Sequence, residues 1–160
     1  MTRTLVVCVG NSLVGDDAAG CAVHQRLAAA PLPDGLRLCL LGVGGLRLLD
    51  ELQGEDVLIA VDAVQLGAPA GTVHVLPWEA LPSAGAAVTG HGVGLRETIE
   101  VGRRLYPEAM PGRAFLVGVE GRIFDELGAG LGPEVAASIG PAAAAVLALA
   151  AQVAQGASAA

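Results

Sequence analysis

The sequence predicts an α/β fold: a three-layer α/β/α sandwich on a mostly parallel, twisted sheet of about five strands with one antiparallel edge strand. Short runs of Val, Leu and Ile alternate with segments whose apolar residues recur at helical spacing, the pattern of strand–helix–strand units. The 160 residues, 53% of them apolar, can form a core of useful size. We therefore predict a single domain over 1–155, followed by a frayed tail over 156–160.

Each predicted element rests on a local signal. Apolar β-branched runs indicate strands, Pro and Gly pairs indicate turns, and an alternating apolar pattern indicates a half-buried edge strand. In chain order we expect a strand over 5–9, a helix over 16–30, a strand over 36–41, a short helix over 46–52, a strand over 57–61, the edge strand over 72–76, an irregular loop over 77–94, a helix over 94–105, a strand over 114–119 and a helix over most of 135–154. Gly140 and Pro141 interrupt the last, Ala-rich segment, so we expect a break before a packed helix rather than a membrane span.

The charge and the cysteine content exclude several classes of function. A net charge of −7, with nine Arg and no Lys, argues against broad binding of nucleic acid or of an anionic membrane. Cys8, Cys21 and Cys39 lie in apolar settings without a CxxC pair, so we expect three reduced, buried thiols rather than a zinc site. We see no signal peptide in the N-terminal segment and expect a cytoplasmic protein.

Three residues with metal-ligand side chains follow predicted strand ends. Asp17 follows the first strand by one loop, Asp62 directly follows the strand over 57–61, and His91 lies in a Gly-rich loop. In an open α/β sheet, ligands bind beyond the carboxyl ends of the strands. We therefore predict that these three side chains meet at one edge, as an O,O,N set that a first-row divalent metal accepts.

Each of these residues also has a structural alternative. Either Asp can cap a turn or a helix, and His91 can be a loop residue without a role. Asp16 is expected to cap the helix that follows it and to orient the loop. His24, on a helix, and His74, on the edge strand, are interpreted as structural or solvent-facing.

Several other active sites do not fit the sequence. The loop over 10–15 contains two glycines but no GK[ST], and GxGxxG is absent after the first strand, which argues against a P-loop or a dinucleotide site. A phospho-receiver domain needs a Lys that this chain does not contain. Neither Ser12 nor Ser83 lies in a G-x-S-x-G elbow, so a serine hydrolase is not expected.

Five sequence blocks stand out along the chain: VGNSL at 9–13 with Asp16, Asp17 and Gly20, VDA at 61–63, HGVGL at 91–95, LVGV at 116–119 and GLGPEV at 130–135. In this order and spacing they resemble the hydrogenase maturation endopeptidases over nearly the whole chain. The resemblance implies an enzyme that removes the C-terminal extension of a nickel–iron (NiFe) hydrogenase large-subunit precursor after nickel insertion.

The resemblance also implies the site. Asp17, Asp62 and His91 correspond to the metal-binding and catalytic residues of the family. The nickel is expected to come with the substrate precursor, and no tightly bound cofactor of the protein's own is expected. The precursor is the expected partner, and we expect a monomer that binds neither nucleic acid nor membrane.

Two readings without peptidase activity stay open at this point. The same O,O,N set could belong to a non-enzymatic module that senses or carries nickel during hydrogenase assembly. Alternatively, the acids could be structural parts of a plain α/β ligand-binding domain. Tight nickel binding by the protein alone would favour the carrier, and substitution of His91 would test the ligand-binding domain.

Overall fold

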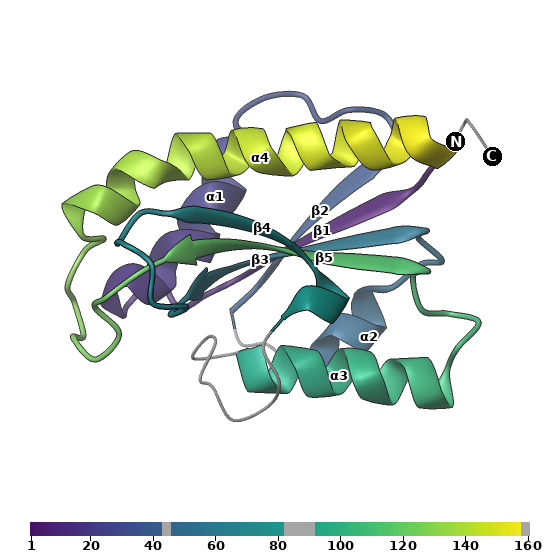
Figure 1. Cartoon of the computed structure of the whole chain (residues 1–160), viewed down its shortest axis with the longest axis horizontal. Coiled ribbons are helices and arrows are strands. Elements are labelled where there is room, and N and C mark those ends of the chain that lie inside the picture. The colour runs from purple at the N-terminus through teal and green to yellow at the C-terminus, as the bar shows by residue number, and fades with distance from the viewer. Residues whose placement is uncertain (43–45, 82–91, 158–160) are drawn as a thin grey trace.

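The computed structural model describes residues 1–42, 46–81 and 92–157, and its centre is a five-stranded sheet in the order β2-β1-β3-β5-β4 (Figure 1). The strands are β1 (Thr4–Val9), β2 (Leu36–Leu41), β3 (Val57–Val64), β4 (Val73–Pro77) and β5 (Arg113–Glu120). Strand β1 pairs in parallel with β2 and β3, β3 pairs in parallel with β5, and β4 runs antiparallel to β5 at the edge. The predicted sheet is therefore confirmed.

Helices cover both faces of this sheet and complete the three predicted layers (Figure 1). Helices α1 (Ala19–Ala28) and α4 (Pro133–Ala157) lie on one face, and α2 (Arg47–Glu51) and α3 (Gly92–Leu105) lie on the other. Successive side chains of a strand point to opposite faces. Val6 of β1 therefore packs in the core with α1 and α4, while its neighbour Leu5 packs with α2 and α3. Every residue of β1 and β3 is buried, as predicted for strands covered on both sides.

The first helix begins later than predicted. Residues Gly15–Ala18 form a separate 3-10 turn, η1, and α1 starts only at Ala19. Neither η1 nor α1 has a side-chain cap at its start, so the prediction that Asp16 caps this helix was wrong. The carboxylate of Asp16 is instead used elsewhere in the fold, as described below.

The last helix is continuous, whereas the sequence predicted a break at Gly140 and Pro141. Helix α4 runs from Pro133 to Ala157 with Pro141 inside it, and so extends into the residues predicted as a frayed tail. A proline inside a helix costs about 3 kcal/mol. Buried residues on both sides of it, such as Val135 and Val146, belong to the core shared with α1, and this packing holds the helix together. Among the described helices, α4 alone is long and apolar enough to cross a membrane, yet its buried side packs on α1 and the sheet.

Strand β3 continues three residues further than predicted, so Asp62 lies inside the strand instead of following it. The cause is pairing with β5, which extends from Val57 to Val64. Strand β1 makes its last pair with β3 at Val61. Asp62 therefore lies just beyond the last pair that β3 makes with its other neighbour, β1.

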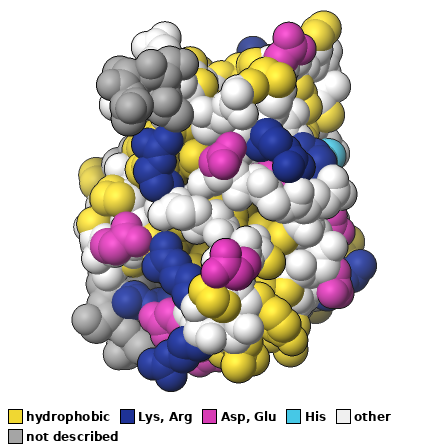
Figure 2. Space-filling model, turned by 90° about the vertical axis from the view of Figure 1, so that its right-hand side faces the viewer, with side chains coloured by type: hydrophobic (Ala, Val, Ile, Leu, Met, Phe, Trp, Pro, Cys, Tyr) yellow, Lys and Arg dark blue, Asp and Glu magenta, His cyan; other side chains and the backbone are white. Residues whose placement is uncertain are grey.

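Three arginines lie at the amino ends of the parallel strands. The backbone N–H of Arg3 donates to Asp56 Oδ2 at 2.8 Å, and the guanidinium of Arg37 donates to Glu55 Oε1 at 2.9 and 2.8 Å. Arg113 begins β5 at the same edge. Figure 2 faces this end of the molecule and shows Arg side chains interspersed with Asp and Glu.

Candidate functional site

The loop after β1 is compact because two glycines allow close backbone contacts. A Cβ atom added to Gly20 would lie 1.9 Å from the carbonyl oxygen of Val9, so α1 can pack this closely on the end of β1 only with glycine there. A Cβ atom added to Gly10 would lie 2.4 Å from the carbonyl oxygen of Asp17. The loop thus folds back on itself and fixes Asp17 at the carboxyl edge of the sheet.

Asp17 and Asp62 lie at this edge, and both raise the pKa of the same thiol, that of Cys21. Both are buried, with 7% and 1% of their surface exposed, and η1, which carries Asp17, contacts β3, which carries Asp62. Burial raises the pKa of Cys21, and the negative charges of Asp17 and Asp62 raise that pKa further. Two of the three predicted site residues are therefore brought together. His91 lies outside the described residues.

The arrangement offers oxygen donors in a buried setting. Asp62 Oδ1 accepts the backbone N–H of Ala63 at 2.8 Å, which orients the carboxylate. Buried charges in proteins are paired or bind cations, and carboxylate oxygens bind divalent metals. Within the described ranges no group of three or more His, Cys, Asp and Glu side chains is placed to hold a metal. A cation beside Asp17 and Asp62 would therefore take its other ligands from outside these ranges or from a bound partner.

Thiol chemistry is disfavoured at this edge. The three cysteines are free, as predicted, although only Cys8 is fully buried. Burial raises the pKa of Cys8 and of Cys21 above the ordinary value, so both stay protonated at neutral pH. Because the thiolate is the nucleophile and the metal ligand, neither Cys8 nor Cys21 is suited to either role.

Asp16 joins two loops that are more than one hundred residues apart in the sequence. Its Oδ2 atom accepts the backbone N–H groups of Arg122 and Ile123 at 2.8 and 2.9 Å, and its Oδ1 atom accepts that of Gly132 at 2.8 Å. Only 1% of the Asp16 surface is exposed. Asp16 thus fixes the connection over 121–132 to the loop that carries Asp17. The expectation that Asp16 orients the loop is thus confirmed, but its partners in the connection over 121–132 were not predicted. The available signal was a second acid beyond what one helix cap requires.

Glu120 is a second buried carboxylate at the same edge that the sequence analysis did not single out. It ends β5, and its Oε1 atom accepts the backbone N–H groups of Leu66 and Gly67, both at 2.9 Å. Its Oε2 atom lies 2.9 Å from Nε2 of His74. Glu120 therefore holds the loop after β3, and the structural role inferred for His74 is confirmed.

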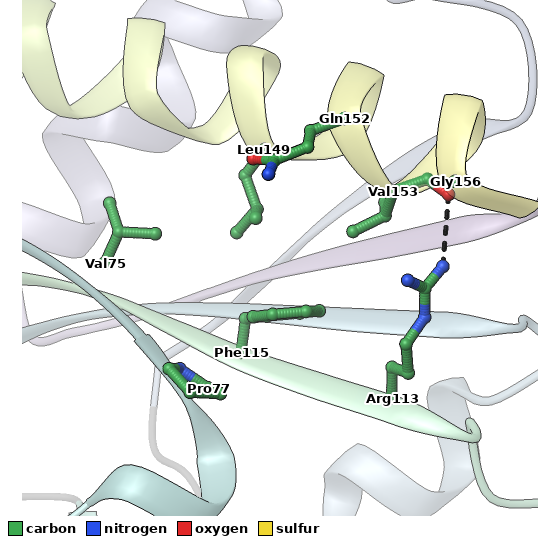
Figure 3. Close-up of a pocket in the computed structure, with 8 residues that line it drawn as sticks. All are labelled: Val75, Pro77, Arg113, Phe115, Leu149, Gln152, Val153 and Gly156. Atoms are coloured by element: carbon green, nitrogen blue, oxygen red, sulfur yellow. Dashed lines mark hydrogen bonds between the residues drawn. The ribbon is translucent and has the colours of Figure 1, made fainter.

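A groove of about 370 Å³ lies away from these acids, between the β4–β5 edge and the end of α4 (Figure 3). Val75, Phe115 and Leu149 face into it, and the Arg113 guanidinium donates to the carbonyl oxygen of Val153 at 3.1 Å. No acidic side chain lines this groove. It belongs to the amino half of β5 and is separate from the edge that holds Asp17 and Asp62.

Comparison with known proteins identifies related sequences. A family model described as hydrogenase maturation protease matches residues 21–149, which include Asp62 and His91 and begin after Asp17. The hydrogenase expression/formation protein HupD of Rhodobacter capsulatus is 32% identical over 137 residues, which are 84% of this chain and 64% of that protein. The hydrogenase 2 maturation protease of Escherichia coli is 34% identical over 121 residues, which are 73% of this chain and 72% of that protein. The chain thus spans less than two thirds of the length of HupD, and likewise only 62% of HoxM of Azotobacter vinelandii.

Solved structures share the same architecture. The hydrogenase maturating endopeptidase HybD from E. coli superposes with a TM-score of 0.79 at 30% identity, covering 95% of this chain and 94% of that one. The solution structure of an endopeptidase from E. coli gives a TM-score of 0.80 at 33% identity, covering 92% of this chain and 91% of that one. The α/β/α sandwich described above is therefore the fold of these endopeptidases.

Proposed function

The chain belongs to the hydrogenase maturation protease family, and we propose that it is an endopeptidase that removes the C-terminal extension of a nickel–iron hydrogenase large-subunit precursor after nickel insertion. The observation that carries the proposal is that Asp17 and Asp62 are both buried at one edge, on the contacting elements η1 and β3. We place the reaction in the cytoplasm, where the three free cysteines stay reduced, and we expect a monomer.

In this proposal the nickel belongs to the substrate. Asp17, Asp62 and His91 bind the nickel of the loaded precursor, and only a loaded precursor is held in place. Binding the metal positions one peptide bond beside it, and positioning alone can lower a barrier by several kcal/mol. The protein thereby couples cleavage to completion of metal insertion.

The chemical step is hydrolysis of that peptide bond. The oxygen of a water adds to the carbonyl carbon, the C–N bond breaks, and the new amine takes up a proton. Either the metal polarises the carbonyl, or a water held by the carboxylates of Asp17 and Asp62 attacks it. Both routes need the two acids ionised and near the metal, so both predict that either acid is required.

The decisive experiment is incubation of the protein with nickel-loaded precursor, followed by mass measurement of the large subunit. We expect the mass to fall by that of the C-terminal extension, and we expect nickel-free precursor to stay uncut. Equal cleavage of the two precursors would contradict a role for nickel in recognition. Cleavage of neither would contradict the peptidase assignment.

The alternative is a module that senses or carries nickel without cutting the precursor. Nickel affinity separates the two, because a carrier binds the metal tightly by itself whereas the proposed peptidase needs the precursor to supply it. Calorimetric titration of the protein alone with nickel measures this difference. We expect weak binding, and submicromolar affinity without precursor would favour the carrier.

A further inference from the structure

Two exposed leucines lie on the loops that frame the candidate site. Leu13, in the loop that carries Asp17, has 62% of its surface exposed, and Leu127, in the connection over 121–132, has 81% exposed. Exposed apolar residues scattered singly are normal, whereas apolar residues gathered on one part of the surface mark a contact with a partner. Nothing in the hydrolysis proposed above accounts for them.

The two loops are joined, so these leucines lie on neighbouring backbone segments. Val14 and Leu127 form an antiparallel bridge, and the N–H of Gly128 donates to the carbonyl oxygen of Leu13 at 2.8 Å. The N–H of Gly15 donates to the carbonyl oxygen of Ala129 at 3.2 Å. With Asp16 fixing both ends of the connection over 121–132, the leucines are held in place before any partner arrives. Such preorganisation reduces the entropy lost on binding.

We propose that Leu13 and Leu127 form the docking surface for the hydrogenase large-subunit precursor, next to the segment that is cut. This inference rests on the proposed function, and it names the part of the protein that grips the substrate protein itself rather than its nickel. Leu13 precedes Asp17 by four residues in one compact loop, so a precursor that brings its metal to Asp17 lies near Leu13.

The charges beside Leu127 select among possible occupants. Asp125 and Glu126 precede it and are both exposed. They would repel an anionic membrane surface, and in a symmetric pair of this chain they would bring like charges together. A precursor segment with an apolar side chain flanked by basic ones could pack on the leucines and pair with the two acids. This is the chemistry that we assign to the docking segment.

The test compares Leu127→Ser and Leu13→Ser with the matched control Leu105→Ser. Leu105 is 65% exposed at the end of α3, away from the carboxyl edge. Affinity for nickel-loaded precursor is measured by calorimetry, and trimming is measured separately by mass. We expect each docking variant to weaken precursor binding about tenfold, the usual effect of losing a central interface residue. The control should bind as wild type does, and Leu127→Met should restore most of the affinity.

The outcomes separate the docking surface from the proposed activity. Weaker binding by the two docking variants, with unchanged melting temperatures, supports the surface whether or not the wild type cuts the precursor. Absence of trimming by the wild type counts against the peptidase alone. Binding by Leu127→Ser and Leu13→Ser that equals that of Leu105→Ser would overturn the docking surface, as would a fall in the trimming rate at saturating precursor with no change in affinity.

Discussion

At the amino edge of the sheet the guanidinium of Arg37 pairs with carboxylates, whereas buried carboxylates at the carboxyl edge are held mainly by backbone N–H groups. Arg37 contacts Glu55 and Glu51. At the carboxyl edge Asp16 accepts three backbone N–H groups, and Glu120 accepts two besides its contact with His74. The two edges belong to the same sheet, but their carboxylates have different partners: a guanidinium at one edge and mainly backbone N–H groups at the other.

The difference shows where a cation is favoured. An arginine that pairs with a carboxylate cancels its charge, but a neutral N–H group leaves the negative charge in place and only fixes its position. Asp16 and Glu120 therefore add negative potential to the edge that carries Asp17 and Asp62. Such a potential attracts a metal and a basic segment and disfavours an anionic ligand. The guanidinium of Arg37 neutralises carboxylate charge at the amino edge, whereas the carboxyl edge keeps the negative charge that favours a cation.

The largest effect should come from Asp62→Asn and Asp17→Asn, the changes that remove charge from the candidate site. We expect each to reduce trimming of nickel-loaded precursor at least about a hundredfold, because metal binding supplies several kcal/mol of barrier lowering. The fold should survive, since asparagine at position 62 keeps the oxygen that accepts the Ala63 N–H. His91→Ala should behave alike. The measurement is the trimming rate by mass together with the melting temperature, and trimming by either Asn variant at the wild-type rate would remove that acid from the site.

Asp16→Asn should have the opposite signature, with a large effect on stability. If the amide oxygen keeps the N–H groups of Arg122 and Ile123, the amide nitrogen faces the N–H of Gly132, which now bonds a carboxylate oxygen. A buried N–H left unpaired costs about 1–3 kcal/mol, so we expect the free energy of unfolding to fall by about that amount. Denaturant unfolding measures this, with the exposed Asp34→Asn as the control, which should stay within about 0.5 kcal/mol of wild type. An Asp16→Asn protein as stable as wild type would show that this carboxylate is not an anchor.

The sequence was sufficient for the layers and the sheet because those depend on patterns repeated over many residues. The buried run Val57–Val61 and the alternating edge strand each carry a strong local signal, and their pairing follows from the right-handed topology of α/β proteins. The end of β3 was wrong by three residues because pairing with β5, a contact distant in sequence, extends it past Asp62. The break predicted at Pro141 was wrong for a similar reason. Local helix propensity does not include the packing of α4 on α1, which keeps the helix continuous.

The site was predicted only in part, for a related reason. Asp17 and Asp62 could be placed at one edge because strand direction determines where a strand ends. The roles of Asp16 and Glu120 depend on backbone N–H groups from distant loops, and no residue pattern marks such donors. His91 stays a prediction, since it lies outside the described residues.

Glu120→Gln tests whether the second anchor at the carboxyl edge resembles the first. Glutamine keeps one oxygen for the N–H groups of Leu66 and Gly67, and its amide can donate to a neutral His74. We therefore expect a loss of only about 1 kcal/mol, smaller than for Asp16→Asn. Hydrogen exchange should become faster at the Leu66 and Gly67 amides while that of Ile123 stays unchanged. Faster exchange at all three amides would mean that the two anchors form one unit.

The smallest expected effect lies at the amino edge and depends on pH. Burial alone would raise the pKa of Glu55, but the backbone N–H of Gln53 and the guanidinium of Arg37 outweigh it and lower that pKa below the ordinary value. A carboxyl group with a lowered pKa in the folded state stabilises the fold above its unfolded pKa, and this contribution disappears as the pH falls through the folded pKa. At neutral pH we expect Glu55→Gln to cost about 1 kcal/mol, a few degrees in melting temperature.

Calorimetric melting at about pH 7 and about pH 3, below the ordinary glutamate pKa of about 4.3, checks this expectation. The difference between wild type and Glu55→Gln should shrink at the lower pH, because the wild-type carboxyl group then begins to bind a proton. The control is Glu100→Gln, which removes an exposed pair with Arg96 and should change the melting temperature little at either pH. A difference that grows at low pH would contradict the stabilising role assigned to the ionised Glu55. The amino edge would then lose its part in the contrast, since the contact between Arg37 and Glu55 would no longer count as a stabilising ion pair.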